Sequence, residues 1–233
     1  MVLKPDDGPC QQWLGEALSH VEMGEVRIGR PVTGRQGSWQ HDGWVATEFV
    51  PGLEPSGTST ARWHGTIEAG RAFHRAVAHL PRPHCLDERR DPWTIADGAA
   101  WGESSAPHHP LFDTITSRLR DALEPLGTSQ LVHGDLTGNV LFDHEVPTAV
   151  IDVSPYWRPV QYVEGVVVAD ALCWHDAPPS LATDLGVPVA AVARALLFRL
   201  LTTIEREAQG HISESQLQNE AHRYERAATA IGL

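Results

Sequence analysis

The chain alternates between segments with helical and strand-like patterns of apolar residues. From residue 58 to residue 80, apolar side chains recur at helical spacing, and Pro81 and Pro83 end that run. Elsewhere, short β-branched and aliphatic runs lie between turn-forming residues and predict strands. The predicted helices lie near 11–21, 58–80, 111–123, 162–174, 189–207 and 214–231, and the predicted strands at 2–4, 26–32, 44–50, 131–132, 140–142 and 149–151. We therefore expect an α+β fold in which short strands accompany a mainly helical chain.

A hairpin is expected in the middle of the chain. The strand at 140–142 is followed by a polar turn and by the strand at 149–151, after which comes Asp152. Antiparallel pairing of the two strands would return Asp152 to the loop that carries Asp135 and Asn139. Three oxygen-bearing side chains would then converge, and such ligands suit a Mg²⁺ ion that is shared with substrate phosphates.

The residues around this hairpin resemble a known catalytic motif. His133-Gly134-Asp135, then Asn139, then Ile151-Asp152 are similar in order to the catalytic loop and metal-binding aspartate of the aminoglycoside phosphotransferase family, the small-molecule relatives of protein kinases. The resemblance implies that Asp135 accepts or orients the proton of an attacking hydroxyl. It also implies that Asn139 binds one Mg²⁺ and that Asp152 bridges Mg²⁺ to the phosphates of ATP or another nucleoside triphosphate. His133 would pack and hydrogen-bond rather than act as an acid or base.

The same resemblance implies a protein-kinase-like fold with two lobes. Residues 1–52 would form a truncated N-lobe with a small antiparallel sheet, and residues 53–233 a mainly helical C-lobe with the catalytic hairpin at 131–153. The family places a glycine-rich loop over the phosphates, ahead of the phosphate-contacting lysine, and the sequence begins after that point. Three explanations stay open: the true start lies upstream, the chain has been shortened, or the protein is a natural remnant that binds without turnover.

Lys4 is the only lysine among the 233 residues, and it lies in a short apolar run that predicts a strand. The resemblance implies that Lys4 contacts the α- and β-phosphates of the nucleotide. In the family, the next helix supplies a glutamate that pairs with this lysine. Glu16 is the nearest candidate, while Gln11, Gln12 and Glu22 stay open because the pattern does not place the helix precisely.

The strand at 44–50, which ends in the turn Pro51-Gly52, resembles the hinge between the two lobes of the family. The strand at 26–32 precedes it across a polar hairpin loop. The resemblance implies that backbone groups around Thr47 and Phe49 hold adenine, because an extended backbone offers a donor and an acceptor at fixed separation.

The motif departs from the family pattern at one point. Only three residues separate Asp135 from Asn139, whereas the family usually has four. The shorter loop displaces Asn139 unless Gly138 adopts a conformation that other residues avoid.

The resulting hypothesis is Mg²⁺-dependent transfer of the γ-phosphate of a nucleoside triphosphate to a hydroxyl of a small molecule. The alternative is a catalytically impaired nucleotide-binding or scaffold pseudokinase of the same fold. A choline-, homoserine- or sugar-directed kinase would differ from the first hypothesis only in its acceptor.

The net charge of −12 argues against nucleic acid as a partner and permits a cationic substrate. No apolar run has the length of a signal peptide or a membrane span, so we expect a soluble cytoplasmic protein with no membrane partner. A small lobe without its first strands would expose a sheet edge, which predicts a homodimer through residues 1–4 and 25–50.

The remaining candidate ligands suggest packing rather than chemistry. Cys10, Cys85 and Cys173 are odd in number and lack CxxC spacing, which predicts free thiols rather than disulfides or a zinc site. His74 and His79 are five residues apart and would not share a helix face, so packing or surface roles are expected. Trp157 and Arg158, in the segment after Asp152, are expected to pack on the helical lobe or to line an acceptor pocket.

Overall fold

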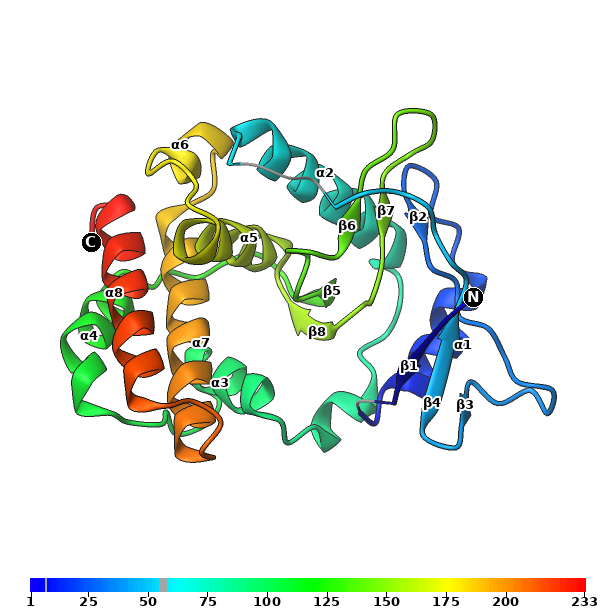
Figure 1. The fold of residues 1–233 in the computed structure, drawn as a ribbon, viewed down its shortest axis with the longest axis horizontal. Helices are drawn as coiled ribbons and strands as arrows, with labels where there is room; N and C mark the ends of the chain where they lie inside the picture. The colour runs from blue at the N-terminus through cyan, green and yellow to red at the C-terminus, as the bar shows by residue number, and fades with distance from the viewer. Residues whose placement is uncertain (7, 55–57) are drawn as a thin grey trace. The chain divides into compact units, whose positions relative to one another are not determined.

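The computed structural model describes residues 1–6, 8–54 and 58–233, which form helices and short strands (Figure 1). The chain divides into two compact units. The first comprises Met1–Ser56, Gly65–Arg89 and Thr128–Val160, and the second comprises Gly57–His64, Arg90–Gly127 and Gln161–Leu233. The hairpin that was expected to be catalytic, residues 131–153, therefore belongs to the same unit as the N-terminal strands. The lobe boundary expected between residues 52 and 53 stays a prediction.

The first unit begins with a three-stranded antiparallel sheet in the order β1-β4-β3. Its strands are β1 (Val2–Pro5), β4 (Trp44–Thr47) and β3 (Gln40–His41), and Lys4 lies opposite Val45. Helix α1 (Gln11–His20) follows β1, as the apolar pattern predicted.

The segment at 26–32 differs from its prediction. Within this segment only β2 (Arg27–Ile28) is a strand, and it pairs in parallel with β7 (Ala149–Val150) of the predicted hairpin. The chain then turns toward β4, where the Val32 N–H donates to the Ala46 carbonyl. Pro31 lacks an N–H and cannot continue a regular strand, so the segment divides its bonds between two sheets.

The hairpin itself is confirmed. Strand β6 (Val140–Leu141) pairs antiparallel with β7, with Val140 opposite Val150, in a second sheet of order β2-β7-β6. A third sheet was not predicted: β5 (Gln130–His133) pairs antiparallel with β8 (Pro155–Arg158). Trp157 and Arg158 are therefore strand residues, opposite Leu131 and Gln130 respectively.

Helix α2 (Thr60–Val77) packs on this part of the first unit through residues 65–77. Gly65 and Gly70 permit the approach, because a Cβ atom would lie 2.6 Å from the Phe142 ring at the first position and 2.4 Å from Leu136 Cδ1 at the second. Phe73, Val77 and His74 are fully or almost fully buried. The loop that carries Asp135 thus rests on α2.

A disulfide joins Cys10, just before α1, to Cys85 in the 3₁₀ helix η1 (His84–Glu88). The prediction of free thiols was wrong for this pair. Sequence spacing gave no signal, because the two cysteines are 75 residues apart and meet only after the chain has returned past α2. Cys173 is a free thiol, and burial raises its pKa above the ordinary value, which makes it unreactive.

The second unit is helical. Helix α7 (Val189–Ala208) packs against other helices of this unit, among them α3, α4 and α8. The 3₁₀ helix η2 (Pro110–Phe112) directly precedes α4, and the prediction had not included α3 or α6. The other helices are α3 (Pro92–Ala100), α4 (Asp113–Asp121), α5 (Val160–Trp174), α6 (Leu181–Leu185) and α8 (Glu214–Ala230). Among the described residues, no helix is both long and apolar enough to cross a membrane.

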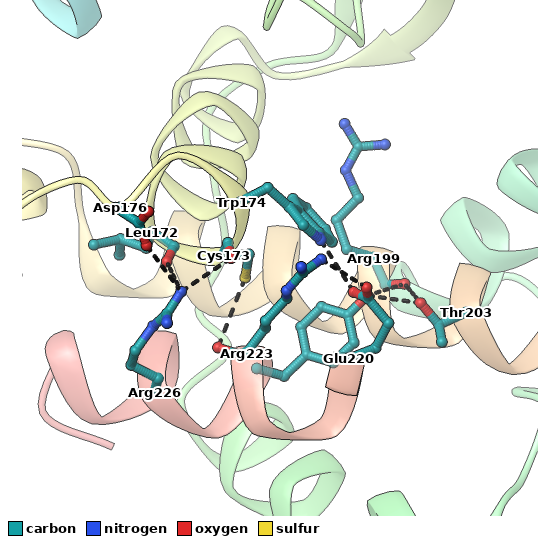
Figure 2. Close-up of polar contacts among 10 residues, drawn as sticks. Leu172, Cys173, Trp174, Asp176, Arg199, Thr203, Glu220, Arg223 and Arg226 are labelled. Atoms are coloured by element: carbon teal, nitrogen blue, oxygen red, sulfur yellow. Dashed lines mark hydrogen bonds and ion pairs between the residues drawn. The ribbon is translucent and has the colours of Figure 1, made fainter. Parts of the chain in front are cut away.

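Polar contacts connect α5, α7 and α8 within the second unit (Figure 2). Arg226 of α8 donates to the carbonyls of Leu172 and Cys173 at the end of α5, and the Trp174 indole donates to Glu220. The Arg199 guanidinium of α7 forms a buried bidentate ion pair with Asp170 of α5. These contacts connect the three helices through hydrogen bonds and one buried ion pair.

Candidate functional site

The loop between β5 and β6 begins at Gly134, where glycine is required by packing. The Gly134 N–H donates to the Ser154 carbonyl at 2.9 Å, which brings the loop against the segment that leads into β8. A Cβ atom at this position would lie 2.3 Å from the Tyr156 ring. The glycine therefore allows β8 to support the loop immediately before Asp135.

His133 connects the two segments that carry the candidate carboxylates. Its Nε2–H donates to the Ile151 carbonyl at 3.0 Å, so its Nδ1 is an acceptor. That Nδ1 receives the N–H groups of Asp135 at 3.2 Å and Ser154 at 3.4 Å. Burial lowers the pKa of His133, which keeps the ring neutral and suited to these bonds. The expected packing and hydrogen-bonding role fits this geometry.

The short loop after Asp135 closes as a tight turn. The Asn139 N–H donates to the Leu136 carbonyl at 3.0 Å, and Gly138 has a φ of +82°. Glycine thus supplies the left-handed conformation that the shortened spacing requires. The Asn139 Nδ2 donates to the Asp135 carbonyl at 2.8 Å, which leaves Oδ1 as the ligand atom of that side chain.

Asp152 lies just beyond the end of β7 in a left-handed conformation with φ of +50°, which is uncommon for a non-glycine residue. Lys4 Nζ forms an ion pair with Asp152 Oδ1, so β1 and the hairpin meet at this point. The Asp152 side chain is 52% exposed and therefore accessible to a ligand. Burial is the main cause of the lowered pKa of His133; the charges of Asp135 and Asp152 raise this pKa and the charge of Lys4 lowers it.

Lys4, Asn139 and Asp152 line a cavity of about 350 Å³ in the first unit. This volume lies within the usual range for small-molecule sites. Apolar side chains from β1, α1, β4 and the hairpin line much of the remainder. They include Val2, Leu14, Leu18, Val45, Leu141, Val150 and Ile151. The cavity therefore combines an apolar wall with a charged group of residues.

The other predicted site residues divide into two groups. Thr47 and Phe49 line the cavity, as a hinge segment would. Glu16 does not: it is exposed, and its carboxylate accepts a hydrogen bond from Gln12 at 2.8 Å. The face of α1 toward the cavity carries Gln11, which was an open alternative to Glu16. Glu16 is five residues further along and points elsewhere because of the helical period.

Sequence reasoning also missed the role of Trp39. Its side chain lines the cavity and packs so closely on α1 that a Cβ atom at Gly15 would lie 2.4 Å from Trp39 Cγ. A glycine inside an otherwise helical pattern was the available signal of this close contact.

The donor set fits a magnesium ion that is shared with phosphates. Mg²⁺ is usually bound through one or two carboxylates together with waters and substrate phosphates. Asp152 offers an accessible carboxylate and Asn139 an amide oxygen at the same cavity. In the described ranges, no group of three or more His, Cys, Asp or Glu residues forms a complete metal cage. The two residues would hold the ion only partly and leave its other positions to the nucleotide.

The sequence profile of the phosphotransferase enzyme family matches residues 12–153, more than half of the chain, and the chain belongs to that family. The match spans nearly all of α1, strand β4 and the hairpin of β6 and β7, and it begins after Lys4. No curated protein sequence matches the chain significantly.

Solved structures share the fold at low sequence identity. An aminoglycoside phosphotransferase from Alicyclobacillus acidocaldarius is 16% identical, with a TM-score of 0.61 over 98% of this chain and 85% of that protein. A spectinomycin phosphotransferase in complex with ADP and spectinomycin is 15% identical, with a TM-score of 0.54 over 98% and 84%. A choline/ethanolamine kinase family protein from Mesorhizobium loti is 14% identical, with a TM-score of 0.56 over 99% and 82%. The predicted protein-kinase-like α+β fold is thereby confirmed.

Proposed function

We propose that this protein transfers the γ-phosphate of ATP, or of another nucleoside triphosphate, to a hydroxyl group of a small molecule with Mg²⁺. The observation that carries the proposal is the meeting of Lys4, Asn139 and Asp152 at one cavity, with Asp135 held through His133 beside them. Structural relatives in complex with ADP or AMP-PNP support the choice of nucleotide.

Each residue has one role in this proposal. Lys4 steadies the α- and β-phosphates, and backbone groups around Thr47 and Phe49 hold adenine. Asn139 and Asp152 would hold Mg²⁺, which supplies charge neutralisation at the phosphates when bound. Because Lys4 pairs with Asp152, the nucleotide enters a site whose two charged groups already face each other.

Asp135 positions the acceptor. The acceptor oxygen attacks the γ-phosphorus, the bond from that phosphorus to the bridging oxygen of ADP breaks, and the hydroxyl proton passes to the Asp135 carboxylate. Phosphoryl transfer requires little covalent participation by the protein, so positioning and electrostatics provide the rate. The net charge of −12 favours a cationic acceptor, and relatives bound to spectinomycin and hygromycin B are consistent with a small molecule.

A nucleotide-binding pseudokinase is the second candidate. The specific observation in its favour is the loop between Asp135 and Asn139, which is one residue shorter than usual for the family. Turnover separates the two candidates, because both bind ATP and only the enzyme transfers phosphate.

ATP with Mg²⁺ is expected to raise the melting temperature of the protein. At 100 times the dissociation constant, a ligand that binds only the folded state stabilises it by about 2.7 kcal/mol. Asp152→Asn should lose the Mg²⁺-dependent part of the shift, which differential scanning fluorimetry measures with ATP alone and with ATP and Mg²⁺. Asp143→Asn, an exposed change in the same hairpin, is the matched control. Absence of any shift in the wild type would leave a scaffold role.

We also propose that the protein forms a homodimer through the β1-β4-β3 sheet. Strand β1 is at one edge of this sheet, and Met1, Leu3 and Trp44 are large apolar residues that are 74%, 58% and 49% exposed. Edge strands with exposed apolar residues favour pairing with another chain. Light scattering should give twice the monomer mass at high concentration, and a constant monomer mass would refute the proposal.

A further inference from the structure

His74 on α2 is a buried histidine to which the site described above assigns no role. His74 is only 2% exposed. Its Nε2 accepts the backbone N–H of His133 at 3.1 Å, and its own backbone carbonyl accepts Gln130 Nε2 at 2.7 Å. Two hydrogen bonds from one residue of α2 therefore hold both ends of β5.

The first of these bonds fixes the protonation of the His74 ring. Because Nε2 accepts, the proton of the neutral ring is on Nδ1. Burial, and then the nearby His133, lower the pKa of His74 to about 3, so the ring stays neutral. The Nδ1 atom is buried without a hydrogen-bond partner among the residues the structure describes. An unpaired buried donor costs about 1–3 kcal/mol, and an apolar side chain would avoid that cost.

The bond between the His133 N–H and His74 is important because strand β8 offers few hydrogen bonds at the end of β5. Pro155 of β8 lies opposite His133 in the register and has no N–H to donate across the sheet. The Pro155 carbonyl accepts a hydrogen bond from Arg89 Nη1 at 2.9 Å. The end of β5 therefore relies on α2 as well as on β8 for its position.

The His133 ring connects the end of β5 to the candidate site through hydrogen bonds. It bonds the N–H of Asp135 directly, and it bonds Ile151 and Ser154, which flank Asp152. A shift of the His133 backbone would therefore move the supports of both carboxylates. Misplacement of reacting groups by about 1 Å can cost about 100-fold in rate.

We propose that His74 is a positioning residue, which acts through His133 to place Asp135 and Asp152 for phosphoryl transfer. The inference rests on the proposed function. The Nε2 acceptor is needed for the His133 N–H, and this need explains why the Nδ1–H of His74 is buried without a partner among the described residues. A local cost in stability of this kind is typical of functional sites.

One arm of the test does not depend on activity. Nitrogen-15 NMR of the histidine rings should show His74 protonated on Nδ1 and His133 on Nε2. The His74 ring should stay neutral from pH 8 to pH 5. His74 lies against His133, which itself lies near Asp135, Asp152 and Lys4. A proton on His74 Nε2, or titration of His74 near pH 6.5, would overturn the proposal.

The second arm compares two substitutions. Gln places a carbonyl oxygen near the position of the His Nε2 and can accept the His133 N–H, whereas Leu has a suitable size and cannot. His74→Leu is expected to lower kcat by about 10-fold to 100-fold, with KM for ATP within about twofold, and His74→Gln to retain most of kcat. His79→Leu, at an exposed position on the adjoining segment, is the control.

Equal kcat values for folded His74→Leu and the wild type would refute the positioning role, as would equal losses in His74→Leu and His74→Gln. If His74→Leu does not fold, His74→Asn replaces it, because its shorter amide does not reach His133 and should lose more kcat than His74→Gln. A wild-type protein without transferase activity would refute the proposed function instead, while the NMR result would still decide the bond between His74 and His133.

Discussion

Asp135→Asn is expected to reduce phosphoryl transfer by about 1,000-fold while ATP affinity changes by less than about twofold. General base catalysis and orientation by one side chain contribute about 100-fold to 10,000-fold, and an amide cannot accept the hydroxyl proton. Asp135 does not line the cavity of Lys4 and Asp152, so nucleotide binding should persist. Its backbone bonds to His133 and Asn139 do not depend on the carboxylate and should also persist.

The measurement is transfer of label from γ-labelled ATP to an aminoglycoside or amino-alcohol acceptor of the wild type, alongside calorimetry with ATP and Mg²⁺. Asp143→Asn again removes a carboxylate from the same hairpin and should retain full activity. Undiminished turnover in Asp135→Asn would refute the assignment of this residue. Loss of ATP binding as well would show that the side chain supports the loop rather than the reaction.

Loss of the Cys10–Cys85 disulfide is expected to lower the free energy of unfolding by about 4 kcal/mol. The bond closes a loop of 75 residues, and the loss of loop-closure entropy in the unfolded chain is of this size in the chain-entropy model. Urea unfolding of the wild type with and without dithiothreitol measures the effect.

The double variant Cys10→Ser/Cys85→Ser provides the matched comparison. It should have the stability of the reduced wild type, and dithiothreitol should not change it further, since Cys173 is buried and unreactive. A midpoint in the wild type that is insensitive to reductant would contradict the disulfide. A reductant effect in the double variant would assign the change to another part of the protein.

Local patterns predicted the elements whose partners are close in sequence. The hairpin of β6 and β7 was predicted because both strands and the turn lie within about a dozen residues, and its register fixes where Asp152 lies. The helices α1, α2, α4, α5, α7 and α8 were predicted from apolar periodicity, which is also a local property of the sequence. The sequence also identified Gly138 as the residue that would accommodate the short loop, and its positive φ agrees.

Long-range contacts were not predictable in this way. The pairing of β2 with β7, of β5 with β8 and of Cys10 with Cys85 depends on the path of the chain between distant segments. Glu16 shows that the orientation of a side chain on a helix is harder to predict than the helix itself. A helix can be recognised from its apolar spacing, but a rotation of about 100° per residue decides which polar side chain faces a cavity.

Helix α1 is fixed at both of its ends. The disulfide at Cys10 precedes its first turn, and Arg30 donates to the carbonyls of Leu18, Ser19 and Val21 at its last turn. A cavity wall that is anchored twice has little freedom to swing outward. A ligand would then enter a site already shaped for it, and binding would lose less conformational entropy than it would with a mobile helix.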